Sequence, residues 1–243
     1  MTAPTLRALG AALTSPGDAM RQMTTSPRPI ALGILLGLVV VAAGMATLPR
    51  QLALLNQALA PTGDPMRDMH LVRMQAGLLR VVVVDRLVPA PTFVLAAVLL
   101  VLAAEPVLAV AEERRRMLWA LAIVGLAPLV VHRLGELVVT YLSPVPDPLR
   151  LGDAIALPQR FATGPALLWW SDGSPPGWLL SVNTRLNLFS VWSVAIWSIG
   201  LRELDRGDPT AWHVALPAGC VLVAGLITYW LKPVVSALVL GAP

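Results

Sequence analysis

Four ionisable side chains lie within or beside apolar stretches of this sequence, and these residues are the best suited to chemistry. They are Glu105, His132, Arg133 and Glu136. On a helix, His132 and Glu136 (i, i+4) and Arg133 and Glu136 (i, i+3) meet on one face. Ionisable groups at membrane depth are costly to bury, so the set could form a proton or ion relay. The alternative is a structural Glu–Arg pair near the outer interface, with Arg133 extending towards water.

These residues do not complete a catalytic motif. Glu112 and Glu113, followed by His132, invite comparison with intramembrane metalloproteases of the CAAX-processing type. That pattern needs an arginine where this chain has Met117, and it needs a second histidine motif. A zinc site requires at least three protein ligands. The Gly-x-Ser-Gly segment of rhomboid-type proteases is absent, and Ser171 has no histidine partner for a hydrolase triad. We therefore expect no enzymatic activity, no metal and no cofactor.

Composition places the chain among membrane proteins. Of its 243 residues, 56% are hydrophobic and only 13% are charged, and the mean hydropathy is +0.72. A soluble domain carries roughly 25% charged residues. The apolar dominance argues against a nucleic acid partner, although the net charge is +4. The single cysteine, Cys220, lies in an apolar run and is expected to be a small buried residue.

Five apolar stretches approach or exceed the roughly 20 residues that a membrane-spanning helix needs. The central stretch has an uncharged centre, 188–201, and runs directly into a charged stop. Pro106 is expected to kink the second span and Pro128 to interrupt the third. The sequence therefore predicts an all-α, polytopic membrane protein with a five-helix transmembrane bundle. The expected spans are 29–48, 91–111, 117–142, 184–206 and 212–231.

The segments outside the spans complete the expected domain organisation. Residues 1–28 form a polar, basic and amphipathic segment before a transmembrane domain of residues 29–243, and a helix is expected to start at Ser15. Residues 50–90 and 143–182 are the expected extracytoplasmic loops. The first has apolar residues at helical spacing, which predicts an amphipathic helix on the membrane surface.

The arginines predict the orientation of the chain. They are densest in three short segments, 1–28, 112–116 and 202–211. Because cytoplasmic segments carry an excess of Lys and Arg, we expect these segments on the inside. The protein is then a multi-pass membrane protein with a cytoplasmic N-terminus and an extracytoplasmic C-terminus.

A stripe of small residues in the first span predicts a helix contact surface. Gly33, Gly37 and Gly44 fall on one face of a helix, and small residues let a second backbone approach closely in a membrane. The contact could be within the bundle or with a partner chain. In the central span, Trp192 and Trp197 could stack on a ligand, or could serve packing or lipid contact.

Two segments carry a resemblance to a known family. They are LTSPGDAMRQMTTSPRP at residues 13–29, with Pro16, and NLFSVWSVAIWSIGLREL at residues 187–204, with Phe189, Trp192 and Gly200. Together with Pro128 in the third span, they make the chain resemble the Yip1 domain family in its bacterial branch. The resemblance implies five membrane helices, a cytoplasmic N-terminus and no catalytic residues. Eukaryotic members are linked with vesicle trafficking and Rab GTPases, and some bacterial members accompany ABC-type export systems.

These observations lead to one expected function and one alternative. We expect a non-enzymatic accessory or scaffold subunit that lies in the lipid bilayer and contacts a membrane-protein partner, such as a multisubunit export complex. The alternative is a small ion- or proton-coupled transporter that uses Glu105, His132 and Glu136.

Overall fold

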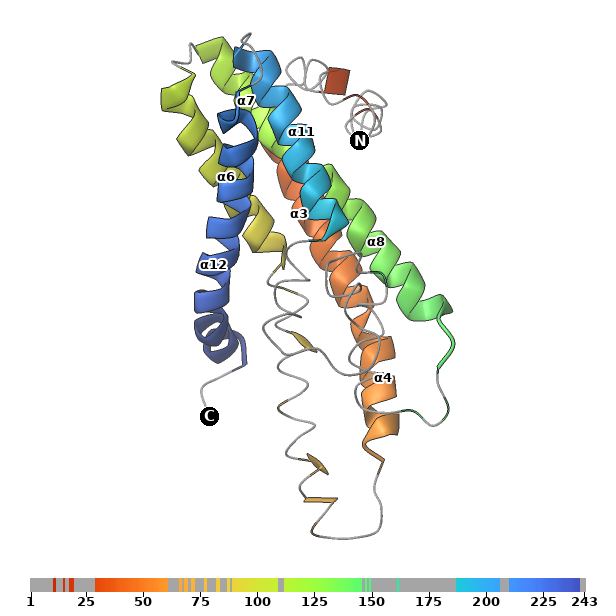
Figure 1. Ribbon diagram of the computed structural model, residues 1–243. Helices are drawn as coiled ribbons and strands as arrows, with labels where there is room; N and C mark the ends of the chain where they lie inside the picture. Colours follow the sequence, from red (N-terminus) through yellow and green to blue (C-terminus); the bar gives the residue numbers. More distant parts are fainter. Residues whose placement is uncertain are drawn as a thin grey trace. The chain divides into compact units, whose positions relative to one another are not determined.

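The computed structural model describes most of the expected spans, and every regular element in them is helical (Figure 1). The described residues are 29–60, 89–108, 112–145, 187–205 and 210–240, with the isolated positions 11, 15, 18, 19, 66, 68, 69, 71, 72, 77, 82, 83, 87, 147, 149 and 161. The α-helices are α3 (Pro29–Ala46), α4 (Leu48–Ala58), α6 (Pro89–Val107), α7 (Glu112–Val124), α8 (Ala127–Leu142), α11 (Leu188–Asp205) and α12 (Trp212–Leu240). The expected all-α fold class is confirmed for this part of the chain.

Three helical runs are long and apolar enough to cross a membrane: Gly33–Ala58, Arg114–Leu142 and Trp212–Leu231. A shorter apolar helix, Pro91–Val107, lies in α6. Charged residues at the end of α11 shorten its uncharged part. The chain thus has the helices of a membrane protein, while the full count of five spans stays a prediction.

The helix bounds differ most from the expected spans at three places. The helix α6 ends at Val107 rather than at 111, with Pro106 inside its last turn, and the expected kink stays a prediction. The charged segment that begins at Glu112 is already the first turn of α7. The last helix continues to Leu240, which is the extension that its apolar C-terminal residues favour.

The expected interruption of the third span is present. The helix α7 ends at Val124 and α8 begins at Ala127, with a two-residue turn between them. Pro128 then lies in the first turn of α8, where a missing N–H removes no helical hydrogen bond. The break therefore precedes the proline.

Little of the expected surface segments lies within the described residues. Near the N-terminus, the amides of Asp18 and Ala19 donate to the carbonyl of Ser15 at 3.1 Å each, which is the expected helix start. Pro16 lies outside the described residues. Of the segment 50–90, α4 is amphipathic, but its position at a membrane surface stays a prediction.

The chain divides into two compact units, which are described separately. The first comprises residues Met1–Val40, Ala90–Val131 and Leu188–Thr228, and the second Val41–Pro89, His132–Asn187 and Tyr229–Pro243.

The core of the first unit lies between α7 and α11, which run side by side (Figure 1). Every residue from 121 to 129 is buried. A helix that is apolar and buried all round belongs to the interior of a bundle. A second contact joins α6 to α12, where the hydroxyl of Thr92 donates to the hydroxyl of Thr228 at 3.0 Å. The fully buried large side chains of this unit are Leu100, Val101, Leu118, Leu121, Val124, Ile196, Trp197 and Leu201.

The second unit has a smaller apolar core around α4. Leu48, Leu54 and Leu55 are buried together with Val82, and Val145 packs against them. The hydroxyl of Tyr141, near the end of α8, donates to the carbonyl of Ala46 at the end of α3, with 2.9 Å between the oxygens. This bond ties α8 to the junction between α3 and α4.

Candidate functional site

Glu105 has its ionic partner in the first unit. Its carboxylate lies 2.5 Å from the guanidinium of Arg115, so the pair joins the end of α6 to the start of α7. The side chains are 31% and 46% exposed, respectively. Exposed ion pairs contribute about 0–1 kcal/mol to stability. The position and the exposure are those of a surface pair across a helical hairpin.

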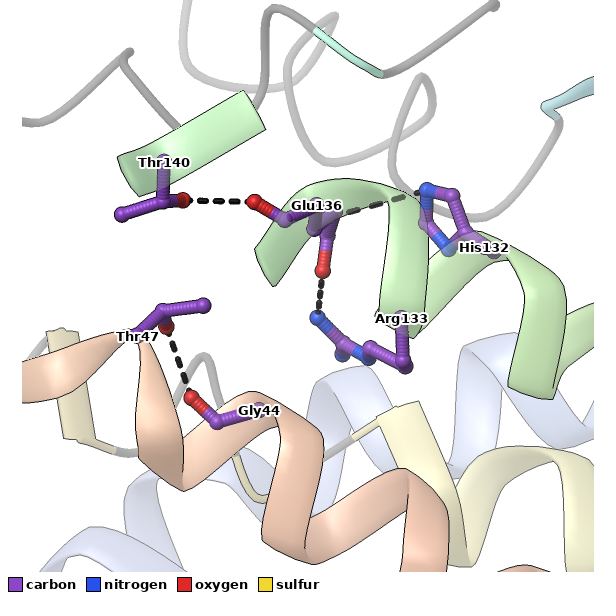
Figure 2. A network of polar contacts seen from close by, with 6 residues as sticks. All are labelled: Gly44, Thr47, His132, Arg133, Glu136 and Thr140. Atoms are coloured by element: carbon purple, nitrogen blue, oxygen red, sulfur yellow. Dashed lines mark hydrogen bonds and ion pairs between the residues drawn. The ribbon is translucent and has the colours of Figure 1, made fainter. Parts of the chain in front are cut away.

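The other three ionisable candidates form a buried cluster on α8 in the second unit (Figure 2). The guanidinium of Arg133 donates to one carboxylate oxygen of Glu136. The other oxygen lies 3.7 Å from Nε2 of His132. The side chains of all three residues are at most 8% exposed. The expected i, i+3 pairing of Arg133 with Glu136 is therefore present, and it is buried.

Neighbouring groups complete the surroundings of this cluster. Thr140 donates its hydroxyl to the backbone carbonyl of Glu136 at 2.7 Å (Figure 2). The ring of Phe161 stacks on His132, with 6.2 Å between the ring centroids. Phe161 also packs on Gly135, where a Cβ would lie 2.1 Å from the ring. The absence of a side chain at Gly135 lets Phe161 cover this face of α8.

The described contacts of this cluster are charge pairs. An ionised Glu136 that accepts from Arg133 is a charge-assisted pair, and such pairs hold both side chains in one geometry. In the described part of the chain, no group of three His, Cys, Asp or Glu side chains could hold a metal ion. The cluster can stabilise the helix or can take part in proton binding.

The three glycines of the expected stripe have different surroundings. At Gly33 an added Cβ would lie 3.3 Å from the side chain of Ile123, so α3 packs closely on α7. At Gly37 no described atom would lie within 4 Å of the added carbon. Gly44 is buried and accepts a hydrogen bond from the Thr47 hydroxyl through its carbonyl, at 2.7 Å (Figure 2). Among the described residues, open space lies beside Gly37.

The open side of Gly37 belongs to an apolar groove in the first unit. The lining atoms are almost entirely apolar. Two neighbours of the groove on α3, Ile34 and Leu38, are 61% and 60% exposed. The groove is lined by Leu36, Gly37 and Val40 of α3, Phe93 and Val94 of α6, and Leu126 and Leu129.

Two further tight glycine contacts lie between α11 and the end of α7, where the sequence pattern did not point. A Cβ on Gly125 would lie 1.9 Å from Nε1 of Trp197, and a Cβ on Gly200 would lie 2.1 Å from a methyl group of Leu121. A glycine of α11 thus receives a side chain of α7, and the glycine that directly follows α7 receives a side chain of α11. We call these four residues the α7–α11 interlock. A search for pairs of glycine and large apolar residues across expected neighbouring spans could have found it.

Trp197 also bonds to the break between α7 and α8. In an unbroken helix the amide of Leu126 would donate to the carbonyl of Ala122. It donates instead to the carbonyl of Ile123, at 3.0 Å. The indole Nε1–H of Trp197 donates to the carbonyl of Ala122, at 3.2 Å. A buried indole needs such a partner. Of the two expected uses of this tryptophan, packing is the one that its position supports.

The remaining positions from the family resemblance lie along α11. Phe189 is buried, Trp192 is half-buried, and Gly200 is part of the α7–α11 interlock. None of them lies near the cluster of His132, Arg133 and Glu136 in sequence, and they belong to the first unit.

Comparison with known proteins assigns no family, so the class of the protein is described from its fold alone. The described chain is all-helical, with three helices long and apolar enough to cross a membrane. No protein-family model matches the sequence, and no curated protein or solved structure matches it. The resemblance to the Yip1 domain family stays a prediction.

Proposed function

We propose that the protein is a non-enzymatic accessory or scaffold subunit of the bacterial inner membrane, which works through helix contacts with a membrane-protein partner. The proposal includes five spans, a cytoplasmic N-terminus and kinship with the Yip1 domain family. Its main support is the apolar groove at Gly37. In a membrane, close packing supplies the dispersion contacts that drive helix association, because lipid tails are as apolar as the helices.

The polar candidates fit this proposal better than they fit a relay of three groups. Glu105 is partly exposed and paired with Arg115, which leaves only His132 and Glu136 of the three residues in the transport alternative. Glu136 is in turn paired with Arg133 and buried. A buried, paired carboxylate is the arrangement that a structural role requires.

Substitution of Gly37 tests the proposal. In Gly37→Leu no described atom lies within 4 Å of the new Cβ, so we expect the thermal stability of the purified protein to stay nearly the same. The leucine side chain would occupy the groove, so a partner helix should no longer bind there. We expect a chain that co-purifies with the natural protein in mild detergent to be absent from the Gly37→Leu preparation.

A matched control is available on another helix. Gly219 of α12 also has no described atom within 4 Å of an added Cβ. Gly219→Leu makes the same change in size and helix propensity away from the groove, and it should retain the partner. If Gly37→Leu retains both its stability and its co-purifying chains, the groove faces lipid. The proposal then loses its contact surface, and the transport alternative gains.

A further inference from the structure

An arginine of the second unit has a buried nitrogen atom without an acceptor. Arg50 lies in the first turn of α4, and its side chain is half-buried. Its Nε atom is shielded from solvent and has no hydrogen-bond partner among the described residues. A guanidinium stays charged in proteins, and its N–H groups are donors only. A buried donor that lacks an acceptor is costly, so this atom requires an explanation.

The chain around Arg50 supplies no opposite charge. Arg50 is the only charged residue between positions 29 and 60, all of which the structure describes. The buried carboxylate of the same unit, Glu136, is already paired with Arg133. These residues therefore leave the positive charge of Arg50 without compensation.

The position of Arg50 along the chain indicates which acceptor lies near it. Residues 29–49 carry no charge, and at about 1.5 Å per residue they are roughly 32 Å long. They belong to one of the runs that are long and apolar enough to cross a membrane, Gly33–Ala58. The hydrocarbon core of a bilayer is about 30 Å thick. A stretch of this length fills the core and places Arg50 at the level of the lipid headgroups.

The surface beside Arg50 leaves room for such a group. Ala53 and Gln57 follow three and seven residues later on the same face of α4, and both are exposed and uncharged. The small side chain of Ala53 leaves the guanidinium open to an approaching group. Phosphate suits this position, because the N–H groups of a guanidinium point in fixed directions that match its oxygens.

From these observations we infer that Arg50 binds the phosphate group of a membrane phospholipid. The phosphate oxygens accept hydrogen bonds from the exposed part of the guanidinium and neutralise its charge. The bound headgroup then holds the junction between α3 and α4 at the membrane surface. The inference concerns the second unit, and it depends neither on the groove at Gly37 nor on a partner chain.

Thermal unfolding of the full-length protein tests the inference. The protein is purified in a maltoside detergent, which contains no phosphate. Phosphatidylglycerol, or a diacylglycerol with the same acyl chains, is then added. A ligand that binds only the folded protein raises the midpoint of unfolding. We expect phosphatidylglycerol to raise the midpoint more than the diacylglycerol does, because only the former carries a phosphate.

Three variants locate this lipid difference on the chain. It should be largely lost in Arg50→Gln, which removes the charge. It should persist at least in part in Arg50→Lys, since an ammonium also binds phosphate. Arg115→Gln is the matched control, because Arg115 already has an ionic partner in Glu105, and it should keep the difference.

Three results would overturn the inference. One is an equal effect of the two lipids on the natural protein, a comparison that needs no variant and so does not depend on the folding of Arg50→Gln. Another is the full lipid difference in Arg50→Gln, which would place the phosphate elsewhere on the protein. The last is an equal, Arg50-dependent stabilisation by inorganic phosphate alone, which would assign the site to a soluble anion instead of a lipid.

Discussion

At the scale of single residues, the burial of each ion pair determines what it contributes. Glu105 and Arg115 are partly exposed, so solvent screens their attraction. Arg133 and Glu136 have side chains that are 4% and 7% exposed. Removing one partner of a buried pair leaves an uncompensated charge, whereas removing both leaves none.

We therefore predict a strong interaction between Arg133 and Glu136. Arg133→Leu and Glu136→Leu should each lower the free energy of unfolding by about 3–5 kcal/mol, and the double variant should be nearly neutral. Thermal unfolding in detergent measures these changes. Glu105→Gln serves as the control, with an effect of about 0–1 kcal/mol because its pair is exposed. Losses that simply add in the double variant would mean that the two side chains do not act as a pair.

At the scale of elements, the α7–α11 interlock joins the two helices that form the core of the first unit. The interlock depends on both glycines, because each leaves the space that a large side chain of the other helix occupies. The side chain of Trp197 is completely buried and hydrogen-bonded to Ala122, so it has little room to move. Because protein interiors are close-packed, an atom added beside this ring must displace it.

Gly125→Ala should consequently destabilise the protein. The new Cβ would overlap the indole of Trp197, and overpacking of this kind costs about 1–3 kcal/mol. Gly219→Ala, which adds the same carbon into open space, should leave the midpoint of thermal unfolding unchanged or raise it slightly. Equal midpoints for the two variants would show that α7 and α11 separate easily, contrary to the packing described above.

At the scale of the whole molecule, exposed apolar side chains indicate what surrounds the protein. On α12, Leu222, Val223 and Leu226 are 52%, 46% and 60% exposed. Soluble monomers rarely expose contiguous apolar surface of this kind. With 29 residues at about 1.5 Å each, α12 is roughly 43 Å long, which exceeds the hydrocarbon core of a bilayer. Its exposed side chains are suited to lipid contact.

The orientation in the membrane is a further prediction at this scale. A reporter that is active only in the cytoplasm should work when fused after Arg115 or after Arg206, because arginine-rich short segments stay inside. A reporter that is active only outside should work after Pro175. An external signal from the Arg115 fusion would reverse the orientation that we propose.

The sequence by itself determined the features that depend on neighbours along the chain. Apolar stretches of sufficient length predicted helices. The observed bounds agree with them to within a few residues for α3 and α11, and α7 and α8 together cover the expected span 117–142. Pro128 predicted the break between α7 and α8, since a proline cannot donate within a helix. The spacing of Arg133 and Glu136 predicted their pair, because three residues along a helix bring two side chains to one face.

Only the tertiary structure decided which side chains meet between helices. All glycines are alike in the sequence, yet Gly125 and Gly200 receive side chains of a partner helix while Gly37 opens onto a groove. The partner of Glu105 is Arg115, which lies on the next helix and which spacing along one helix does not indicate. These contacts depend on the rotation and depth of each helix against its neighbour. Helical periodicity specifies one face of one helix, but the groups that this face meets are chosen by packing between distant segments.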